Sequence, residues 1–341
     1  MNFILKKKPF LVAEVGQSHH GNFDTVKEII KTIGSTKVDA IKFQTHFADS
    51  ESTFDEPFRS TINIKKNLTS RYKYWESVQF TEKQWIEISK LVKKQNKFFL
   101  SSPFSLKGLH CLLKTNMKAI KIGSGEFFSQ DLINSCLNTR LPIIISTGLS
   151  NISEIKKMIM FLKKKKKKFI ILQCNTSYPT KLEEIGVNYI RQWKKKYNCN
   201  VGISIHSNLI NPSSAAITNG ADLIEMHVKI NEDEFNPDNS SSITIDQLNQ
   251  ICEFREDFNK LTSNNVKKKL TNQQEKLKRI FTKSICLKND KPKNYIIKKR
   301  DIIYKKPGYG FGYKDEQFII GKKLLKKVTS NRILKIKDIK R

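Results

Sequence analysis

The chain has 341 residues, of which 38% are hydrophobic, so it is long enough for one barrel-sized domain with a small appendage or for two domains. Lys and Arg number 63 against 32 Asp and Glu, which gives a formal net charge of +31. The composition excludes a small disulfide-stapled scaffold, but a field of this sign attracts nucleic acid, anionic membranes and small acidic substrates alike.

The excess positive charge is mostly lysine scattered among Asn and Ile. An A/T-biased coding sequence produces this pattern, whereas a dedicated nucleic-acid-binding protein usually concentrates Arg and aromatic residues on one element. A basic nucleic-acid-binding protein is therefore kept as a remote alternative, and we expect neither nucleic acid nor membrane as a partner. The six cysteines are widely spaced without a C-x-x-C pair, which indicates reduced core thiols: Cys111, Cys136, Cys174, Cys199, Cys252 and Cys286.

The N-terminal stretch MNFILKKKPFLVAEVG has only short apolar runs and no small-residue cleavage pattern. No window approaches the 18 apolar residues of a membrane span. These features predict a cytoplasmic protein.

Short runs rich in β-branched and aromatic residues alternate with longer helical patterns along the chain. The predicted strands are 10–14, 40–44, 97–102, 119–124, 142–147, 169–174, 200–206 and 222–227. Amphipathic segments with apolar residues at three- and four-residue intervals lie between them, at 24–33, 82–95, 106–115, 152–164 and 188–197. Eight strand-helix units predict an α/β protein with a (β/α)8 TIM barrel. An open doubly wound sheet is the alternative, because periodicity does not show closure.

A last helical pattern at 244–261 closes this series, and a polar stretch at 262–279 then indicates a linker or an exposed helix. Short strand patterns and a Pro-Gly-x-Gly turn follow. The predicted domains are a catalytic barrel over 1–262, a linker over 263–279 and a small β-rich domain over 280–341, which we expect to pack on a barrel because it is too small for a large core of its own. The hexalysine at 163–168 is interpreted as a solvated turn at the bottom of the barrel.

Polar residues follow every predicted strand at its carboxyl end, where a TIM barrel gathers its functional side chains. A single lysine there usually snorkels to water and a single serine usually caps a helix, but eight strands with this feature predict a shared pocket. In chain order the residues are Glu14, Lys42, Gln44, Ser101, Ser102, Lys121, Ser124, Glu126, Ser146, Thr147, Asn175, Thr176, Tyr178, Ser204, His206, Glu225 and His227.

His206 and His227 end adjacent predicted strands. Neighbouring strands lie about 4.8 Å apart, so both imidazoles can reach one divalent ion. With Glu14 and Glu225 nearby as sources of oxygen ligands, the pair predicts a site for Mn²⁺, Fe²⁺, Zn²⁺ or Mg²⁺.

Lys42 and Lys121 belong to the same predicted pocket, together with the hydroxyl groups of Ser102, Ser124 and Ser146. Two ammonium groups and several small donors predict a site for phosphate or carboxylate. The sequence contains neither a Walker-type loop nor a dinucleotide fingerprint, so a metal beside this anion site favours aldol-like or phosphoenolpyruvate chemistry over kinase or dehydrogenase work.

Eight motifs resemble the sialic acid synthase (N-acetylneuraminate synthase) family in content and order, over nearly the whole chain. They are AEVGQSHHG (13–21), AIKFQTH (40–46), SSPFS (101–105), KIGSGE (121–126), ISTGLS (145–150), QCNTSYP (173–179), GISIHS (202–207) and EMHV (225–228). The tail motif KKPGYGFG (305–312) resembles the antifreeze-protein-like (SAF) domain that these enzymes carry.

The resemblance implies condensation of phosphoenolpyruvate with an N-acetylmannosamine-type sugar to a sialic acid, with release of phosphate, for surface-glycan biosynthesis. It implies a divalent metal cofactor, with Mn²⁺ first and Mg²⁺ or Co²⁺ as alternatives, and a domain-swapped homodimer. The implied catalytic residues are Glu14, Glu126, Lys121 and His227, and the implied metal ligands are His206 and His227. The implied substrate-binding residues are Lys42, Gln44, Ser102, Phe104, Lys121, Ser124, Ser146, Tyr178, Ser204, Asp238 and Lys306.

Three positions depart from the family pattern. Ile205 stands where Asp is common before the seventh-strand histidine, and Asn175 stands where Thr is expected. Lys306 replaces an Arg before the Pro-Gly turn, which keeps the charge but loses the planar fork. Synthases for legionaminic or pseudaminic acid, which use other N-acyl sugars, are therefore the alternative, and a phosphoenolpyruvate-using relative of sugar-phosphate aldolases is a further one.

Overall fold

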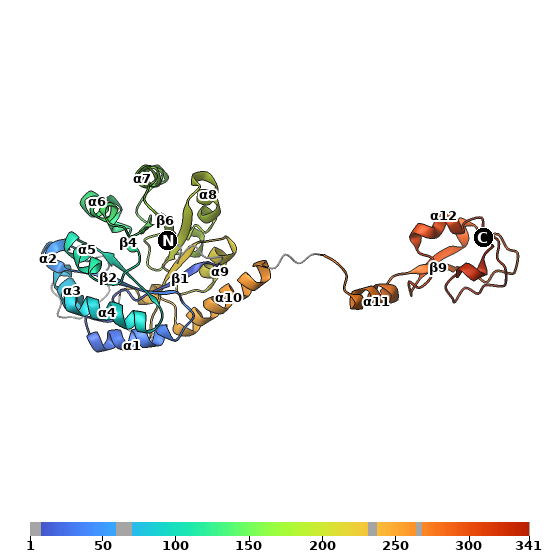
Figure 1. Ribbon diagram of the computed structural model, residues 1–341, viewed down its shortest axis with the longest axis horizontal. Helices are drawn as coiled ribbons and strands as arrows, with labels where there is room; N and C mark the ends of the chain where they lie inside the picture. The colour runs from blue at the N-terminus through green and yellow to red at the C-terminus, as the bar shows by residue number, and fades with distance from the viewer. Residues whose placement is uncertain (1–7, 59–69, 231–236, 264–267, 341) are drawn as a thin grey trace. The chain divides into compact units, whose positions relative to one another are not determined.

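The computed structural model describes residues 8–58, 70–230, 237–263 and 268–340 (Figure 1). The chain divides into two compact units, Met1–Asn264 and Asn265–Arg341. In the described part of the chain, no helix is long and apolar enough to cross a membrane. All six cysteines are free, and all but Cys199 are buried.

Unit 1 is a closed barrel of eight parallel strands, so the predicted TIM barrel is confirmed and the open sheet was wrong. The first and last strands close it, because Phe10 to Glu14 pair in register with Leu223 to His227. The strands are β1 (Phe10–Glu14), β2 (Ala40–Thr45), β3 (Phe98–Pro103), β4 (Ile120–Ile122), β5 (Ile143–Ser146), β6 (Phe169–Cys174), β7 (Asn200–Ile205) and β8 (Leu223–His227).

Helices surround the strands and present their apolar faces to them. Helix α1 begins where the Asn22 side chain accepts the N–H groups of Asp24 and Thr25, and its buried face includes Val26 and Ile30. The helices of unit 1 are α1 (Phe23–Gly34), α2 (Ala48–Glu51), α3 (Arg71–Val78), α4 (Glu82–Lys94), α5 (Leu106–Leu113), α6 (Gln130–Asn138), α7 (Ile152–Lys164), α8 (Asn188–Tyr197), α9 (Asn211–Thr218) and α10 (Ile245–Ser263).

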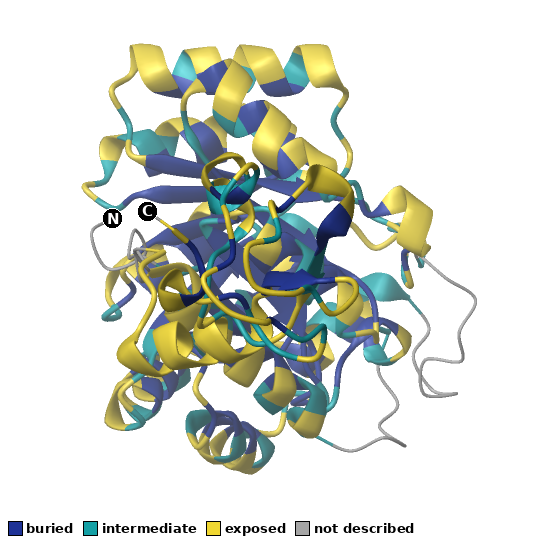
Figure 2. Cartoon of the chain, turned by 90° about the vertical axis from the view of Figure 1, so that its right-hand side faces the viewer, coloured by how far each residue is buried: buried dark blue, intermediate teal, exposed yellow. Residues whose placement is uncertain are grey.

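The two-residue period of the strands sorts side chains between two apolar layers. Odd positions of β1 such as Leu11 face the helices, whereas Phe10 and Val12 belong to a core inside the barrel. Figure 2 shows the strands buried almost throughout and the outer faces of the helices exposed. The inner core consists of Phe10, Val12, Ala40, Leu100, Ala119, Ile144, Ile170, Leu172 and Leu223.

Polar side chains continue these inner rows toward the carboxyl ends of the strands. Glu14 follows Val12 on β1, Lys42 follows Ala40 on β2, and Glu225 follows Leu223 on β8. The amino-terminal part of the barrel interior is therefore filled with apolar groups, whereas its carboxyl-terminal part carries buried charges.

Basic side chains close the opposite, amino-terminal end of the barrel. Arg255 on α10 is 1% exposed, pairs with Asp39 and donates to the carbonyl oxygen of Lys37 at 2.8 Å. Within the hexalysine, Lys167 Nζ donates to the carbonyl oxygens of Cys136 (2.8 Å) and Thr139 (2.6 Å), while its neighbours Lys164–Lys166 and Lys168 are exposed. This lysine run ends α7 and caps the end of α6.

Unit 2 has a small antiparallel sheet of β9 (Ser284–Leu287) and β10 (Ile302–Lys305), as expected for a β-rich domain. Its compact core consists of Ile285, Leu287, Ile297, Ile302, Ile319, Leu324, Val328, Leu334 and Ile339. Two further helices belong to it, α11 (Asn272–Phe281) and α12 (Glu316–Ile319). Helix α11 begins inside the predicted linker and has no buried residue, which corresponds to the exposed-helix interpretation of that stretch.

Candidate functional site

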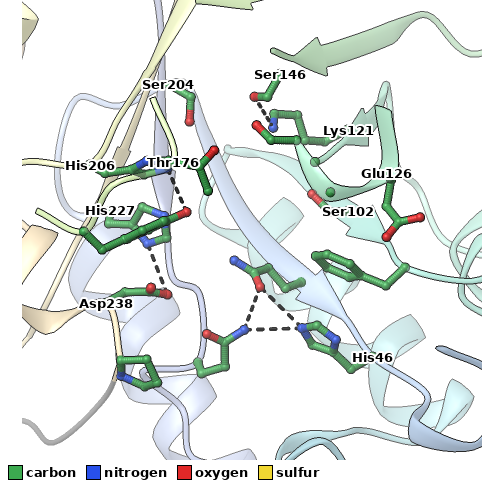
Figure 3. Close-up of a pocket in the computed structure, with 18 of the residues that line it drawn as sticks. His46, Ser102, Lys121, Glu126, Ser146, Thr176, Ser204, His206, His227 and Asp238 are labelled. Atoms are coloured by element: carbon green, nitrogen blue, oxygen red, sulfur yellow. Dashed lines mark hydrogen bonds and ion pairs between the residues drawn. The ribbon is translucent and has the colours of Figure 1, made fainter. Parts of the chain in front are cut away.

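A cavity of about 440 Å³ opens at the carboxyl ends of the barrel strands (Figure 3). Most of the residues predicted from the sequence line it together. They are Lys42, Gln44, Ser102, Phe104, Lys121, Ser124, Glu126, Ser146, Tyr178, Ser204, His206, His227 and Asp238. Side chains from all the inner strand ends except that of β1 thus meet in one place, with Gln17 entering from the loop after β1.

Glu225 lies between the two lysines at the floor of this cavity. Its Oε1 atom is 3.4 Å from Lys121 Nζ and 3.7 Å from Lys42 Nζ, and it accepts a hydrogen bond from Ser204 Oγ at 3.1 Å. Lys42 also contacts Glu14 Oε2 at 2.6 Å, because the register places Glu14 beside Lys42. The floor is therefore an alternating chain of two carboxylates and two ammonium groups.

This arrangement affects the two lysines differently. Burial alone lowers the pKa of Lys42, but the Glu14 and Glu225 carboxylates overcome that effect and raise its pKa above the ordinary value. Burial also lowers the pKa of Lys121, which has only the shared Glu225 close by and is repelled by Lys42, so its pKa stays below the ordinary value. Burial opposes ionisation of Glu225, but Lys121 and Lys42 hold its pKa below the usual range. An anionic ligand beside Lys121 would add the counter-charge that Glu225, which is shared with Lys42, supplies only in part.

Small hydroxyl-bearing side chains lie around Lys121. Its Nζ atom donates to Ser146 Oγ at 2.8 Å, and Ser124 Oγ accepts the backbone N–H of Gly148 at 2.9 Å. A Cβ atom at position 148 would lie 2.2 Å from Thr176 Oγ1 and 2.8 Å from Ser124 Oγ, so a larger residue in place of Gly148 would displace these two hydroxyl groups. Thr176 Oγ1 is buried, lines the cavity and has no hydrogen-bond partner among the described residues. These groups suit a ligand with several anionic oxygens.

The two histidines are neighbours, with ring centroids 5.4 Å apart. His206 Nδ1 lies 2.7 Å from the carbonyl oxygen of Asn175, which only accepts, so Nδ1 carries the proton and Nε2 keeps a lone pair. Burial lowers the pKa of His206 to about 3, which keeps the ring neutral. A neutral imidazole fixed through Nδ1–H is the form that binds a metal through Nε2, so His206 fits a divalent ion.

Of the two carboxylates expected near the histidines, Glu225 does lie near His227, two residues away on the same face of β8, although both carboxylates are engaged by other partners. Glu14 binds Lys42 and Gln44, and Glu225 lies between the lysines. Within the described ranges, no group of three or more His, Cys, Asp or Glu side chains is arranged to hold an ion. His206 and His227 are thus a two-nitrogen set whose other ligands would be water or substrate oxygens.

Four further predicted residues complete the walls of the cavity. Tyr178 OH lies 3.1 Å from His206 Nε2, and Asp238 Oδ2 lies 3.7 Å from His227 Nδ1. Gln44 Nε2 donates to Glu14 Oε1 at 2.9 Å. Burial raises the pKa of Glu126 above its ordinary value, even though Ser129 donates a hydrogen bond to it, so Glu126 takes up a proton more readily than a typical carboxylate.

Two predicted site residues lie outside the cavity lining. Glu14 is 0% exposed and sits behind Lys42 and Gln44, which it orders. Lys306 belongs to unit 2, where its Nζ atom lies 5.4 Å from the ring centroid of Phe281.

Sequence reasoning missed one wall of the cavity, which comes from the segment after β2. Arg71 pairs with Glu56 at 3.1 Å, and Trp75 Nε1 donates to Glu56 Oε2 at 3.1 Å. His46 and Glu51 line the same wall. Because α2 has only four residues, it gave no periodic signal. The sequence of this segment also resembles one bacterial branch of the sialic acid synthase family, but that resemblance assigned no site residue in it.

The chain is similar to known proteins over most of its length. The NeuB family model matches residues 29–267. The chain is 27% identical over 333 residues to the N,N'-diacetyllegionaminic acid synthase of Campylobacter jejuni, with 96% of this chain and 99% of that protein covered. It is 26% identical over 344 residues to a pseudaminic acid synthase of Campylobacter jejuni, with 99% of both chains covered. The crystal structure of a putative spore coat polysaccharide biosynthesis protein E from Chromobacterium violaceum has the same fold, with a TM-score of 0.70 at 16% identity, and the match covers 98% of this chain and 100% of that one.

Proposed function

The chain belongs to the NeuB family, and we propose that it condenses phosphoenolpyruvate with an N-acyl hexosamine to give a nonulosonic acid and inorganic phosphate. Its curated relatives are sugar acid synthases, so the chain is an enzyme of carbohydrate biosynthesis. The observation that carries the proposal is the buried Lys121, which has a lowered pKa, a serine partner and space for an anion beside it.

The cavity offers a binding site for each part of phosphoenolpyruvate. Lys42 and Lys121 supply positive charge, and Ser102, Ser124, Ser146 and Ser204 supply hydroxyl groups to phosphate and carboxylate oxygens. Glu225 lies near both ammonium groups and offsets part of the repulsion between them. In this proposal, these charged and hydroxyl groups would hold the ligand in a largely buried site.

In the proposed reaction, C3 of phosphoenolpyruvate forms a carbon–carbon bond to the aldehyde carbon of the open-chain sugar, whose oxygen becomes a hydroxyl group. Water then adds to the cationic C2, and the C2–O bond breaks to release phosphate and leave a 2-keto acid. Lys121 and Lys42 hold the phosphate oxygens from the first step to the last. Glu126, with its raised pKa, is suited to take the proton from the incoming water.

We assign the metal to His206 and His227, with Mn²⁺ as the first choice and Mg²⁺ or Co²⁺ as alternatives. The support is the neutral His206 ring, whose Nδ1–H donates to the carbonyl oxygen of Asn175, together with the neighbouring His227 ring. A metal at His206 Nε2 would take the place of the Tyr178 OH group, which lies 3.1 Å from this nitrogen. When bound, such an ion would polarise the aldehyde oxygen of the sugar.

Two acceptor classes follow from the family. An N-acetylmannosamine-type sugar would give a sialic acid. A hexose with two acylamino groups, as the names of the legionaminic and pseudaminic acid synthases suggest, would give one of those acids, and this second candidate is favoured by relatives that match over nearly their whole length.

The test is phosphate release from phosphoenolpyruvate with a panel of free N-acyl hexosamines, with and without Mn²⁺. We expect release with one acceptor class, together with a nine-carbon 2-keto acid detected by mass spectrometry. Release that requires a phosphorylated sugar would contradict the free-sugar acceptor and would fit either the aldolase-type alternative or a synthase like the N-acetylneuraminate-9-phosphate synthase of Homo sapiens, which is 25% identical. No release with any acceptor would contradict the proposal.

A further inference from the structure

His46 is held in the missed wall of the cavity by contacts on both faces and at both nitrogens. Its ring stacks on Trp75 with centroids 4.0 Å apart and on Phe104 with centroids 4.4 Å apart, at interplanar angles of 14° and 15°. Nδ1 lies 2.6 Å from Glu51 Oε1. The His46 side chain is 4% exposed and that of Glu51 is 6% exposed, so the pair is shielded from water.

The other edge of His46 faces two glutamines, Gln17 and Gln44. Its Nε2 atom lies 3.3 Å from both Gln17 Nε2 and Gln44 Oε1. Gln17 Nε2 donates to Gln44 Oε1 at 2.6 Å, and Gln44 Nε2 donates to Glu14 Oε1 at 2.9 Å. A continuous chain of hydrogen bonds thus joins Glu51 at one end to Glu14 at the other.

The two carboxylates at the ends determine the direction of every bond between them. Glu51 can only accept, so His46 carries a proton on Nδ1. Glu14 at the other end can also only accept, so the Gln17 NH₂ group is the one that lies beside His46 Nε2, and Nε2 accepts from it. The equally long contact of Nε2 with Gln44 Oε1 then joins two acceptors and is not a hydrogen bond. Gln17 therefore turns its NH₂ group toward His46 and Gln44, and Gln44 turns its NH₂ group toward Glu14. Glu51 is itself fixed, because its second oxygen accepts the backbone N–H of Phe47 at 3.3 Å.

We propose that Glu51 and His46 are positioning residues that act through Gln17 to orient Gln44 for the sugar acceptor. In this orientation the carbonyl oxygen of Gln17 and the second N–H of Gln44 are available to a ligand. The wall then offers one acceptor and one donor, which match a hydroxyl or acylamino group of an N-acyl hexosamine. The choice of ligand rests on the proposed function, whereas the proton on His46 Nδ1 does not.

Glu51→Gln and Glu51→Leu separate this role from a merely structural one. The amide oxygen of Gln still accepts from Nδ1–H, but Leu does not accept a hydrogen bond. We expect Glu51→Leu to raise KM for the sugar about tenfold, as for the loss of one well-placed hydrogen bond, with KM for phosphoenolpyruvate unchanged. Glu51→Gln should stay near the parent values.

Two further variants complete the comparison. Gln17→Met breaks the same chain at another point and should raise the sugar KM alike, which keeps the test valid if Glu51→Leu folds poorly. Asp49→Asn changes an exposed carboxylate in the same short helix, which pairs with Lys107 at 2.7 Å and accepts a hydrogen bond from Ser50 Oγ at 3.0 Å, and it should leave both KM values unchanged.

The ¹⁵N spectrum of the His46 ring tests the tautomer without catalysis, with His46→Phe used to assign its signals. We expect the Nδ1–H tautomer in the parent chain and in Glu51→Gln, and its loss in Glu51→Leu. An Nε2–H tautomer in the parent chain would overturn the proposal, and so would an unchanged sugar KM in both Glu51→Leu and Gln17→Met. No turnover by the parent chain with any sugar would instead overturn the proposed function and with it the ligand assigned to this wall.

Discussion

Lys121 Nζ lies 3.4 Å from Glu225 Oε1 at the floor of the barrel mouth, and Glu225 is shared with Lys42. Lys121 is thus a buried cation whose nearby carboxylate, Glu225, also serves Lys42. Burial and the repulsion of Lys42 lower its pKa, while the partial attraction of Glu225 opposes the shift. An anionic substrate would complete the pairing, which gives the site a reason to bind anions and a measurable pH dependence.

The first prediction concerns that pH dependence. Anion binding needs the charged form of Lys121, so on the alkaline side kcat/KM for phosphoenolpyruvate should fall as pH rises through the lowered pKa, before the 10.5 of an ordinary lysine. The fall in kcat should come at higher pH, because the bound anion raises the pKa of Lys121. In Lys121→Arg the cation persists at all these pH values, so its alkaline fall should move upward. Identical alkaline limbs in both proteins would assign the titration to another group.

The second prediction concerns the metal. Mn²⁺ should bind the parent chain in a calorimetric titration, and His206→Ala and His227→Ala should each weaken binding at least tenfold. Asn175 contributes only its carbonyl oxygen to His206, so Asn175→Thr should leave Mn²⁺ binding near the parent value. Equal Mn²⁺ affinity in the parent chain and both histidine variants would show that His206 and His227 are not metal ligands.

A third prediction addresses the amino-terminal end of the barrel. Arg255→Leu leaves Asp39 without its cation and removes the hydrogen bond to the Lys37 carbonyl. Because Arg255 is 1% exposed, we expect the free energy of unfolding to fall by about 3 kcal/mol in chemical denaturation. Lys260→Ala on the same helix removes an exposed pair with Asp257 and should leave stability nearly unchanged. A similar stability for both variants would show that the buried pair is dispensable.

A fourth prediction concerns the proposed domain-swapped homodimer. If Lys306 serves the barrel of a partner subunit, Lys306→Ala and Lys121→Met chains should complement each other when they are mixed from the unfolded state. Half of the random dimers are mixed and each has one intact site, so activity should recover to about a quarter of the parent value. Recovery should be absent if Lys306 serves its own barrel. Gel filtration should give a dimer at micromolar concentration, and a monomer would contradict the assignment.

The barrel and most of its mouth could be predicted from the sequence because the inner rows follow simple rules. On β1, Phe10 and Val12 alternate with residues that face the helices, and Glu14 comes next on the same inner row. Eight such rows with a polar residue at the carboxyl end identify both the fold and the location of the site. Closure itself depends on the pairing of β1 with β8, which no local pattern contains.

The partners of the buried charges could not be predicted, because they depend on register between distant strands. Glu225 lies near His227 as expected, but its strand also places it against Ser204 and between the two lysines, which the sequence did not indicate. His46 gave even less signal, since its role depends on Trp75 from one helix and Phe104 from the end of β3. Contacts between side chains from separate elements appear only once the fold is known.

The most direct test of the central claim compares two lysine variants in the phosphate-release assay with Mn²⁺ and the preferred acceptor. Lys121→Met removes the cation from the cavity, whereas Lys107→Met removes an exposed cation that pairs with Asp49. The account predicts that Lys121→Met lowers kcat/KM for phosphoenolpyruvate at least about 10²-fold and that Lys107→Met keeps the parent value. Parent-level activity in a folded Lys121→Met chain would contradict the account.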